Sequence, residues 1–379
     1  MIYTGRHIAW LIFSTLVLTL LSGCSSHSSE PDQPQEKPVL KIYIFAPDNP
    51  IVTRAEIGDV DASEEERAIN ILSVWAFEHN DGKNLVGYVH VANQTIESTK
   101  EIAMEVSDEF ANNNNKPKID IFVAANVAQA NCGLTLGRST TFTALKDAII
   151  NSDYFGLTQP VTTVPAEGLP MSGWLWDQQV SGSAPVFSAR SSYVKLVRSV
   201  SKMRFVFSKS SAAPAISNLS VKLNTGMIPN QEYLFLNGEY DTEKFRIGLE
   251  YAGEATLISG KSSDDINSCT DPSEYEYLGS ESRQQYEARI NTGITEDKIS
   301  ELGRYYLRES DKCLSGKITY NIGETQKEAD FYMADGDNFT RNHTWIVYGY
   351  FMGNGNLKLN VVDVKGWDPK EEPGNLYNW

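Results

Sequence analysis

One cysteine near the start of the chain stands where a thiol could be acylated. Small residues precede it in Leu21-Ser22-Gly23-Cys24, after a short apolar segment, Ile8–Leu21. This segment is too short to span a bilayer and has the length of a signal-peptide core. The pattern is that of a bacterial lipobox, in which Cys24 takes a diacylglycerol and becomes the new N-terminus. The alternative is ordinary secretory cleavage, with Cys24 incidental.

Three further cysteines could form a disulfide or a metal site. Cys132, Cys269 and Cys313 contain no CxxC pair, so they do not predict zinc binding. An exported chain can form disulfides. Cys269 and Cys313 flank a charged stretch and are a candidate pair, whose loop closure would contribute roughly 4 kcal/mol. Three free buried thiols are the alternative.

Motifs for catalysis are missing from the sequence. It contains no GxSxG, Walker loop, GxGxxG or HExxH. Asp59–Ser63 begins like a calcium loop, but Glu64 stands where that loop needs glycine, so an acidic helix start is preferred. Nothing selects a glycosidase pair among the 49 acidic residues. We therefore expect no enzyme, no metal and no cofactor.

Two tryptophans could bind a sugar. Trp174 and Trp176 alternate along an extended segment, an arrangement that could form a stacking platform. Such residues more often fill a core face or a domain seam, which is the preferred interpretation.

The elements that would position these residues are mostly strands. Length predicts two domains, since the chain has 379 residues. The net charge of −16 makes nucleic acid and anionic lipid headgroups poor partners. Ser63 and Glu66 form a capping box that opens a short helical turn. A second short helix is expected over Phe142–Ile150. Strands are expected over Val39–Ala46, Ile71–Phe77, Val86–Val91, Lys118–Ala125, Val194–Phe207, Ile216–Leu223, Gly316–Ile322, Trp345–Met352 and Leu357–Val364.

Short strands with few helices predict an all-β fold of two antiparallel sandwich-like domains with minor helix content. We divide the chain into a lipoprotein signal peptide (1–24), a propeptide with an N-terminal strand (25–54), and two sandwich domains (55–190 and 191–379).

The order of several motifs resembles the fimbrillin family, the subunits of Bacteroidetes type V pili. After Cys24 the motifs are Val39–Ala46, Thr53-Arg54-Ala55, Glu64–Phe77, Lys118–Val127, Leu169–Gly173, Val194–Phe207 and the hairpin Asn342–Trp367. The resemblance implies sandwich domains of transthyretin-like type.

The resemblance also implies a mechanism of assembly. An arginine-specific protease would cut between Arg54 and Ala55, releasing the N-terminal strand with Val39, Leu40, Ile42 and Ile44. A strand from another subunit would then fill the groove by β-strand addition. In this chain the candidate donor strand contains Leu357, Leu359 and Val361. A plain surface arginine is the alternative for Arg54.

The function implied by the resemblance is a structural or adhesive subunit of cell-surface fimbriae. The precursor would be lipid-anchored in the cell outer membrane and would then enter the fimbrium. Its partners would be other pilus subunits, the protease and a host or bacterial surface ligand. Stalk, tip and accessory roles are all open. The alternatives are a surface lipoprotein that binds glycans without polymerising and, last, a glycoside hydrolase.

Overall fold

The structure is a computed structural model. It describes residues 37–45, 63–92, 99–128, 132–150, 155, 160–235, 250–269, 299–333, 339 and 341–364. All of them belong to one compact unit, Lys37–Trp379. No helix within these ranges has the length and apolar character needed to cross a membrane.

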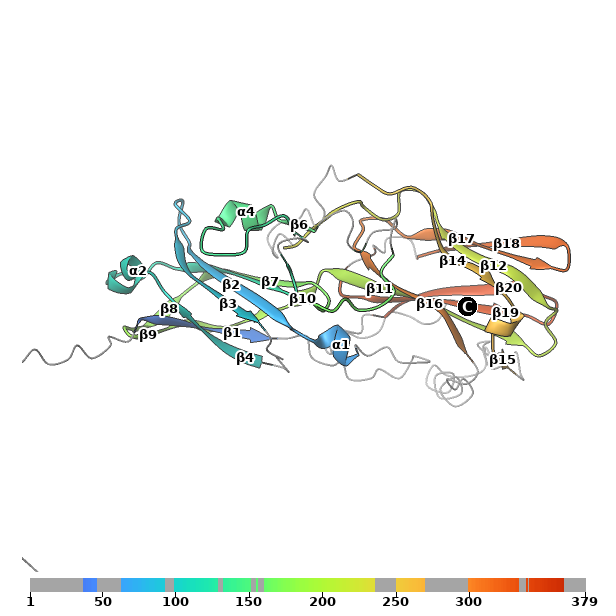
Figure 1. Ribbon diagram of the computed structural model, residues 1–379, viewed down its shortest axis with the longest axis horizontal. Coiled ribbons are helices and arrows are strands. Elements are labelled where there is room, and N and C mark those ends of the chain that lie inside the picture. Colours follow the sequence, from blue (N-terminus) through green and yellow to red (C-terminus); the bar gives the residue numbers. More distant parts are fainter. Residues whose placement is uncertain are drawn as a thin grey trace, which may run out of the picture. The chain divides into compact units, whose positions relative to one another are not determined.

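The first part of this unit is a sandwich of two sheets around one apolar core (Figure 1). One sheet has the strand order β4-β1-β9-β8 and the other β10-β7-β5-β2-β3. Both sheets direct apolar side chains into the core between them. The strands of the first sheet are β1 (Val39–Phe45), β4 (Thr99–Glu105), β8 (Val180–Ser183) and β9 (Val186–Lys195). Those of the second are β2 (Ile71–Glu78), β3 (Leu85–Ala92), β5 (Ile119–Ala125), β7 (Met171–Gln178) and β10 (Val197–Arg198).

A second sandwich follows along the chain and encloses a second core. In one of its sheets β11 lies between β16 and β19, with β15 and β20 also paired; the other sheet has the order β14-β12-β17-β18. The first sheet contains β11 (Val200–Ser210), β15 (Ser268–Cys269), β16 (Ser300–Arg308), β19 (Thr344–Phe351) and β20 (Leu357–Val364). The second contains β12 (Ile216–Leu223), β14 (Ala255–Lys261), β17 (Ser315–Ile322) and β18 (Thr325–Tyr332).

Helices are few and short. They are α1 (Glu64–Arg67), α2 (Asp108–Asn112), α4 (Phe142–Lys146) and a 3₁₀ turn, η1 (Ser263–Asp265). A two-stranded sheet joins β6 (Ile149–Ile150) to β13 (Glu232–Tyr233). Beside it, Leu234 and Phe235 pack with Trp75 and Phe122 on the outer face of the five-stranded sheet. The predicted all-β fold with minor helix content is confirmed.

The strand pairing is less uniformly antiparallel than the sequence predicts. Three pairs run parallel: β1 with β9, β11 with β15, and β11 with β19. Parallel neighbours come from distant parts of the chain, so hairpin signals in the sequence cannot reveal them.

Two predicted elements differ in the structure. The helix expected over Phe142–Ile150 ends at Lys146, and Ile149–Ile150 forms β6 instead. Branching at Cβ favours a strand over a helix at these two isoleucines. The strand expected over Val194–Phe207 is divided among β9, β10 and β11. Its cationic positions were expected to face solvent, but Lys202 is 1% exposed.

The chain passes from the first sandwich to the second between β10 and β11. The boundary predicted near residue 190 falls inside β9, whose pairing with β1 continues to Lys195. The division into domains stays a prediction.

Candidate functional site

The first strand of the described chain fills the middle of a sheet. Alternate residues of β1 point into the core, so Leu40, Ile42 and Ile44 are 0%, 1% and 0% exposed. The alternation is the period of a strand with one buried face. Without β1, the core would have a groove along its full length.

Both edges of β1 are hydrogen-bonded. On one side it runs antiparallel to β4, in a register that extends from Val39 opposite Glu105 to Phe45 opposite Thr99. On the other side it runs parallel to β9, with an irregularity between Lys41 and Tyr43. A strand that left this position would therefore uncover two rows of backbone groups, which is a costly state.

The outer face of β1 carries a polar contact with β4. Lys41 Nζ lies 2.8 Å from Glu101 Oε1, and the Tyr43 hydroxyl donates to Glu101 Oε2 at 2.8 Å. These bonds lower the pKa of Glu101, and the bond with Glu101 raises the pKa of Lys41. Sequence analysis did not single out Glu101. The signal available was Lys41 itself, a cation at an outward position of an apolar strand.

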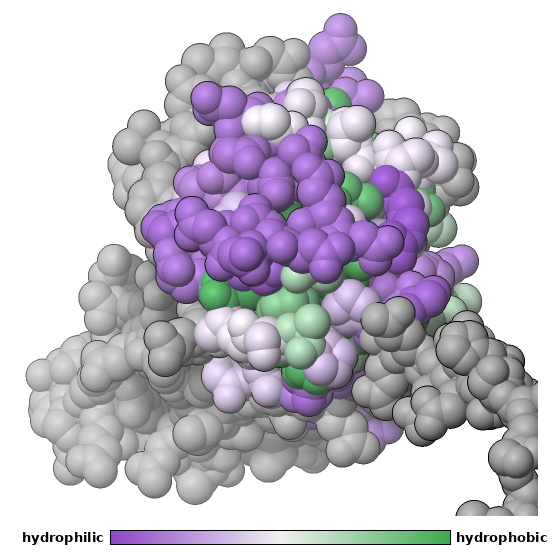
Figure 2. Space-filling model, turned by 90° about the vertical axis from the view of Figure 1, so that its left-hand side faces the viewer, coloured by the Kyte–Doolittle hydropathy of each residue, from purple (hydrophilic) through white to green (hydrophobic). Residues whose placement is uncertain are grey.

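The surface near β1 also has exposed apolar side chains. Large exposed apolar residues in the described ranges are Val186, Tyr193 and Tyr332, and the first two lie on β9 beside β1. Figure 2 views the end of the molecule that carries α2. Hydrophilic residues cover much of the coloured surface there, above a smaller apolar area. Apolar exposure is thus limited in extent on this end.

Several predicted residues lie outside the described ranges. Cys24, Arg54 and Ala55 are among them, so lipidation and processing stay predictions. Displacement of Val39–Phe45 stays a prediction too, although the structure places this strand where displacement would open the core.

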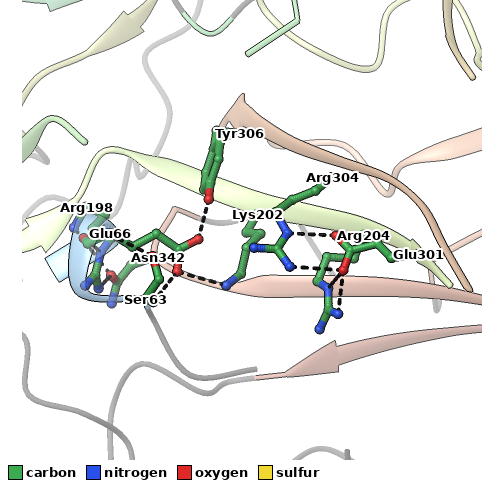
Figure 3. A network of polar contacts seen from close by, with 9 residues as sticks. All are labelled: Ser63, Glu66, Arg198, Lys202, Arg204, Glu301, Arg304, Tyr306 and Asn342. Atoms are coloured by element: carbon green, nitrogen blue, oxygen red, sulfur yellow. Dashed lines mark hydrogen bonds and ion pairs between the residues drawn. The ribbon is translucent and has the colours of Figure 1, made fainter. Parts of the chain in front are cut away.

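A buried polar network begins just where the described chain resumes at Ser63 (Figure 3). The predicted capping box is confirmed: Glu66 N–H donates to Ser63 Oγ at 3.2 Å, and Ser63 N–H donates to Glu66 Oε2 at 2.8 Å. The Glu66 carboxylate also accepts from Lys202 Nζ on β11 at 3.1 Å and from the Tyr306 hydroxyl on β16. Glu66 therefore joins α1 to the second sandwich.

The charges in this network determine one another's ionisation. Burial acts to raise the pKa of Glu66, but Lys202, Tyr306 and the Ser63 N–H together hold it below its ordinary value. Burial lowers the pKa of Lys202, opposed by Glu66. Burial also lowers the pKa of Arg198, which is 1% exposed, to about 10. Its Nε donates to the Glu66 carbonyl at 2.9 Å. The network is thus an ionised one, although it lies inside the protein.

A second buried cluster lies where β13 meets the end of β16. Arg341 pairs with Glu309 and donates through Nη1 to the Leu234 carbonyl at 2.9 Å. Glu232 Oε2 accepts from the Glu309 N–H at 3.0 Å. Burial raises the pKa of Glu232 to about 8, with Arg341 acting against it and Glu309 acting with burial. This carboxyl is therefore largely protonated at neutral pH.

The candidate donor strand forms an edge of the second sandwich. Within the described residues β20 pairs with β19 alone. Leu357, Leu359 and Val361 pack against the second core but are only partly buried. The predicted hairpin of these two strands is confirmed, whereas a donor role for β20 stays a prediction.

The cysteines are placed only in part. Cys132 is buried; burial raises the pKa of its thiol, which donates to the Ala128 carbonyl at 3.5 Å. Cys313 packs against the second core, and the backbone of Cys269 lies in β15. The side chain of Cys269 falls outside the description, so the Cys269–Cys313 disulfide stays a prediction.

The two tryptophans pack with their neighbours. Trp174 stacks on Phe122 with ring centroids 4.9 Å apart, and Trp176 meets the His79 ring edge to face at 4.8 Å. Lys83 Nζ lies 4.3 Å from the centroid of Trp176. These contacts agree with the packing interpretation rather than with a sugar platform. Within the described ranges, no group of three or more His, Cys, Asp or Glu residues is arranged to hold a metal.

Comparison with solved structures identifies the fold. The structure is similar to that of a candidate cell adhesion protein from Parabacteroides distasonis, with a TM-score of 0.52, 16% identity, and coverage of 89% of this chain and 99% of that one. It is also similar to the tip fimbrial protein Mfa3 from Porphyromonas gingivalis with a C-terminal truncation, with a TM-score of 0.50, 13% identity, and coverage of 86% and 99%. The chain has the fold of fimbrial and cell adhesion proteins.

The expected resemblance to fimbrillins is thus confirmed at the level of the fold. Both similar structures are named for fimbriae or adhesion rather than for a catalytic activity. No protein-family model matches the sequence, and no curated protein sequence is significantly similar to it. The fimbrial fold is therefore recognised through the structure.

Proposed function

We propose that the chain is a structural subunit of cell-surface fimbriae that polymerises by strand exchange. The observation that carries this proposal is the position of β1, a seven-residue strand with a fully buried apolar face and a neighbour on each edge. A fimbrial fold with a strand of this kind at its N-terminal side suits replacement of that strand by one from another subunit.

Export and processing precede exchange. Lipidation of Cys24 holds the precursor at the outer membrane, and a protease that is specific for arginine cuts after Arg54. Before the cut, β1 is covalently tethered and its high effective concentration excludes a competitor. After the cut, β1 can leave and a strand from another subunit can enter.

The energetics of the groove make an unfilled state unfavourable. Burying Leu40, Ile42 and Ile44 contributes roughly 1.5–3 kcal/mol for each side chain, about 5–9 kcal/mol together as an upper estimate. The two rows of backbone groups add to this cost. A subunit that has lost β1 is therefore driven to take up another strand.

The donor in this proposal is β20 of a neighbouring subunit. In its own sheet β20 has one paired edge in the described chain, and its apolar residues are partly buried. In the groove it would have two paired edges and a fully buried apolar face, as β1 does. Exchange gains one ladder and additional apolar burial, so it is favourable for the pair of subunits.

A subunit that both accepts and donates a strand occupies an internal position in a fibre. Its partners are other subunits of the fimbrium, and its final location is the cell surface. The packing of Trp174 and Trp176 with protein side chains gives no support to the glycan-binding alternative.

The test is the fate of the chain when the cut is blocked. Arg54→Ala should prevent cleavage and leave a lipid-anchored monomer, and Arg54→Lys should slow an arginine-specific protease. The matched control is Arg138→Ala, since Arg138 is also an exposed arginine, with 57% of its side chain accessible. Electron microscopy and SDS-resistant laddering report polymerisation. Equal incorporation of Arg54→Ala and the control into fibres would refute the proposal.

A further inference from the structure

The contact between β1 and Glu101 has a consequence for the strand that replaces β1. Glu101 belongs to β4, which stays in the sheet when β1 leaves. Lys41 and Glu101 are 36% and 39% exposed at their side chains, and the Tyr43 hydroxyl completes the contact. An incoming strand therefore meets a carboxylate beside its outward residues, at a fixed point along the groove.

Apolar alternation alone does not fix the register of such a strand. A slip by one residue turns the apolar face outward and is strongly disfavoured. A slip by two residues keeps apolar side chains in the groove. A second signal on the outward face is needed to distinguish these even registers, and an ion pair can supply it even when it contributes little affinity.

The sequence of β20 carries the matching signal. The segment Leu40-Lys41-Ile42-Tyr43-Ile44 of β1 aligns with Leu357-Lys358-Leu359-Asn360-Val361 of β20 without a gap. In this alignment Leu357, Leu359 and Val361 take the positions of the three buried residues of β1. Lys358 takes the position of Lys41. A slip by two residues in either direction would put an asparagine there, Asn356 or Asn360.

We propose that Glu101 sets the register in which the Leu357–Val364 strand of a second copy of this chain enters the groove, by pairing with Lys358 where Lys41 stood. The inference rests on the proposed strand exchange. It makes Glu101 a residue that determines specificity and a second copy of the chain the preferred partner. The entering strand runs in the direction of β1, antiparallel to β4 and parallel to β9.

The first experiment is a charge-swap cycle in the full-length precursor, cut with an arginine-specific protease. Glu101→Lys and Lys358→Glu should each slow SDS-resistant laddering by about threefold to tenfold, and the double variant should recover most of the loss. Lys41→Gln is the matched control, because it removes the same contact from the strand that leaves. It should not slow laddering.

The second experiment measures the register directly. Asn356→Cys on the donor and Glu105→Cys on the acceptor should be joined by a short bismaleimide, because Glu105 faces the residue before Leu40 in the present register. Asn356→Cys with Ala103→Cys reports a slip by two residues. Adding Lys358→Glu should shift cross-linking away from position 105.

The outcomes separate the two proposals. Wild-type chains that are cut but form no ladder would refute strand exchange itself. Wild-type chains that form ladders, with the double variant no faster than either single variant and the cross-link unchanged, would overturn the role of Glu101 and leave strand exchange standing.

Discussion

Truncation of one buried residue of β1 should accelerate strand release by a predictable amount. Ile42 is 1% exposed and packs in the first core. Replacing a buried isoleucine by alanine costs about 2–5 kcal/mol through lost burial and the cavity left behind. In the cut precursor this loss weakens the retention of β1 alone. At 1.4 kcal/mol for each factor of ten, Ile42→Ala should speed release by about 30-fold to 4,000-fold.

The assay is the time course of release after cleavage at Arg54, followed by mass spectrometry of the separated fragment. Lys41→Ala is the control on the same strand, because Lys41 points outward and an exposed ion pair contributes little. Its release rate should stay close to that of the wild type. If the two variants release β1 equally fast, burial does not retain the strand and the reasoning fails.

Three further predictions concern anchoring and buried charge. Cys24→Ala should abolish lipidation, so labelled palmitate that still enters the variant would contradict the lipobox. Glu66→Gln should lower the free energy of unfolding by about 3–5 kcal/mol because Lys202 is left as an unpaired buried charge, and Glu66→Gln with Lys202→Met should recover most of it; urea unfolding checks both, and an undiminished double variant loss would refute the pairing. For Glu232 the folded pKa of about 8 exceeds the ordinary 4.5, so its stabilising contribution is full below pH 4.5 and falls as the pH rises towards 8. Relative to Glu232→Gln, the wild type should lose about 1.4 kcal/mol for each pH unit in that window, and parallel pH profiles of the two proteins would disprove it.

Local signals in the sequence were sufficient for local structure. Ser63 and Glu66 satisfy each other's backbone groups within one turn, so their spacing alone predicts the cap. The hairpin of β19 and β20 is equally local, because a turn rich in glycine and asparagine separates two alternating runs. Both predictions are confirmed.

Contacts between distant residues were beyond sequence analysis. Glu66 was assigned only a capping role, but it also binds Lys202 and Tyr306, which lie 136 and 240 residues further along the chain. The cations of Val194–Phe207 were assigned to a solvated face because alternation gives the period of a strand and not what covers each face. The parallel pairing of β1 with β9 has the same origin, since it joins residues about 150 positions apart, as Lys41 and Ser188 show.

The separation of groove and donor strand determines the symmetry of an assembly. The groove of β1 belongs to the first sandwich and β20 to the second, so the contact joins two unlike surfaces. A two-fold dimer joins like surfaces, whereas a head-to-tail contact leaves an unused surface at each end and continues as an open filament. A filament of this kind is polar: one end always presents a groove and the other a strand. Growth can therefore stop only at a subunit that lacks one of the two.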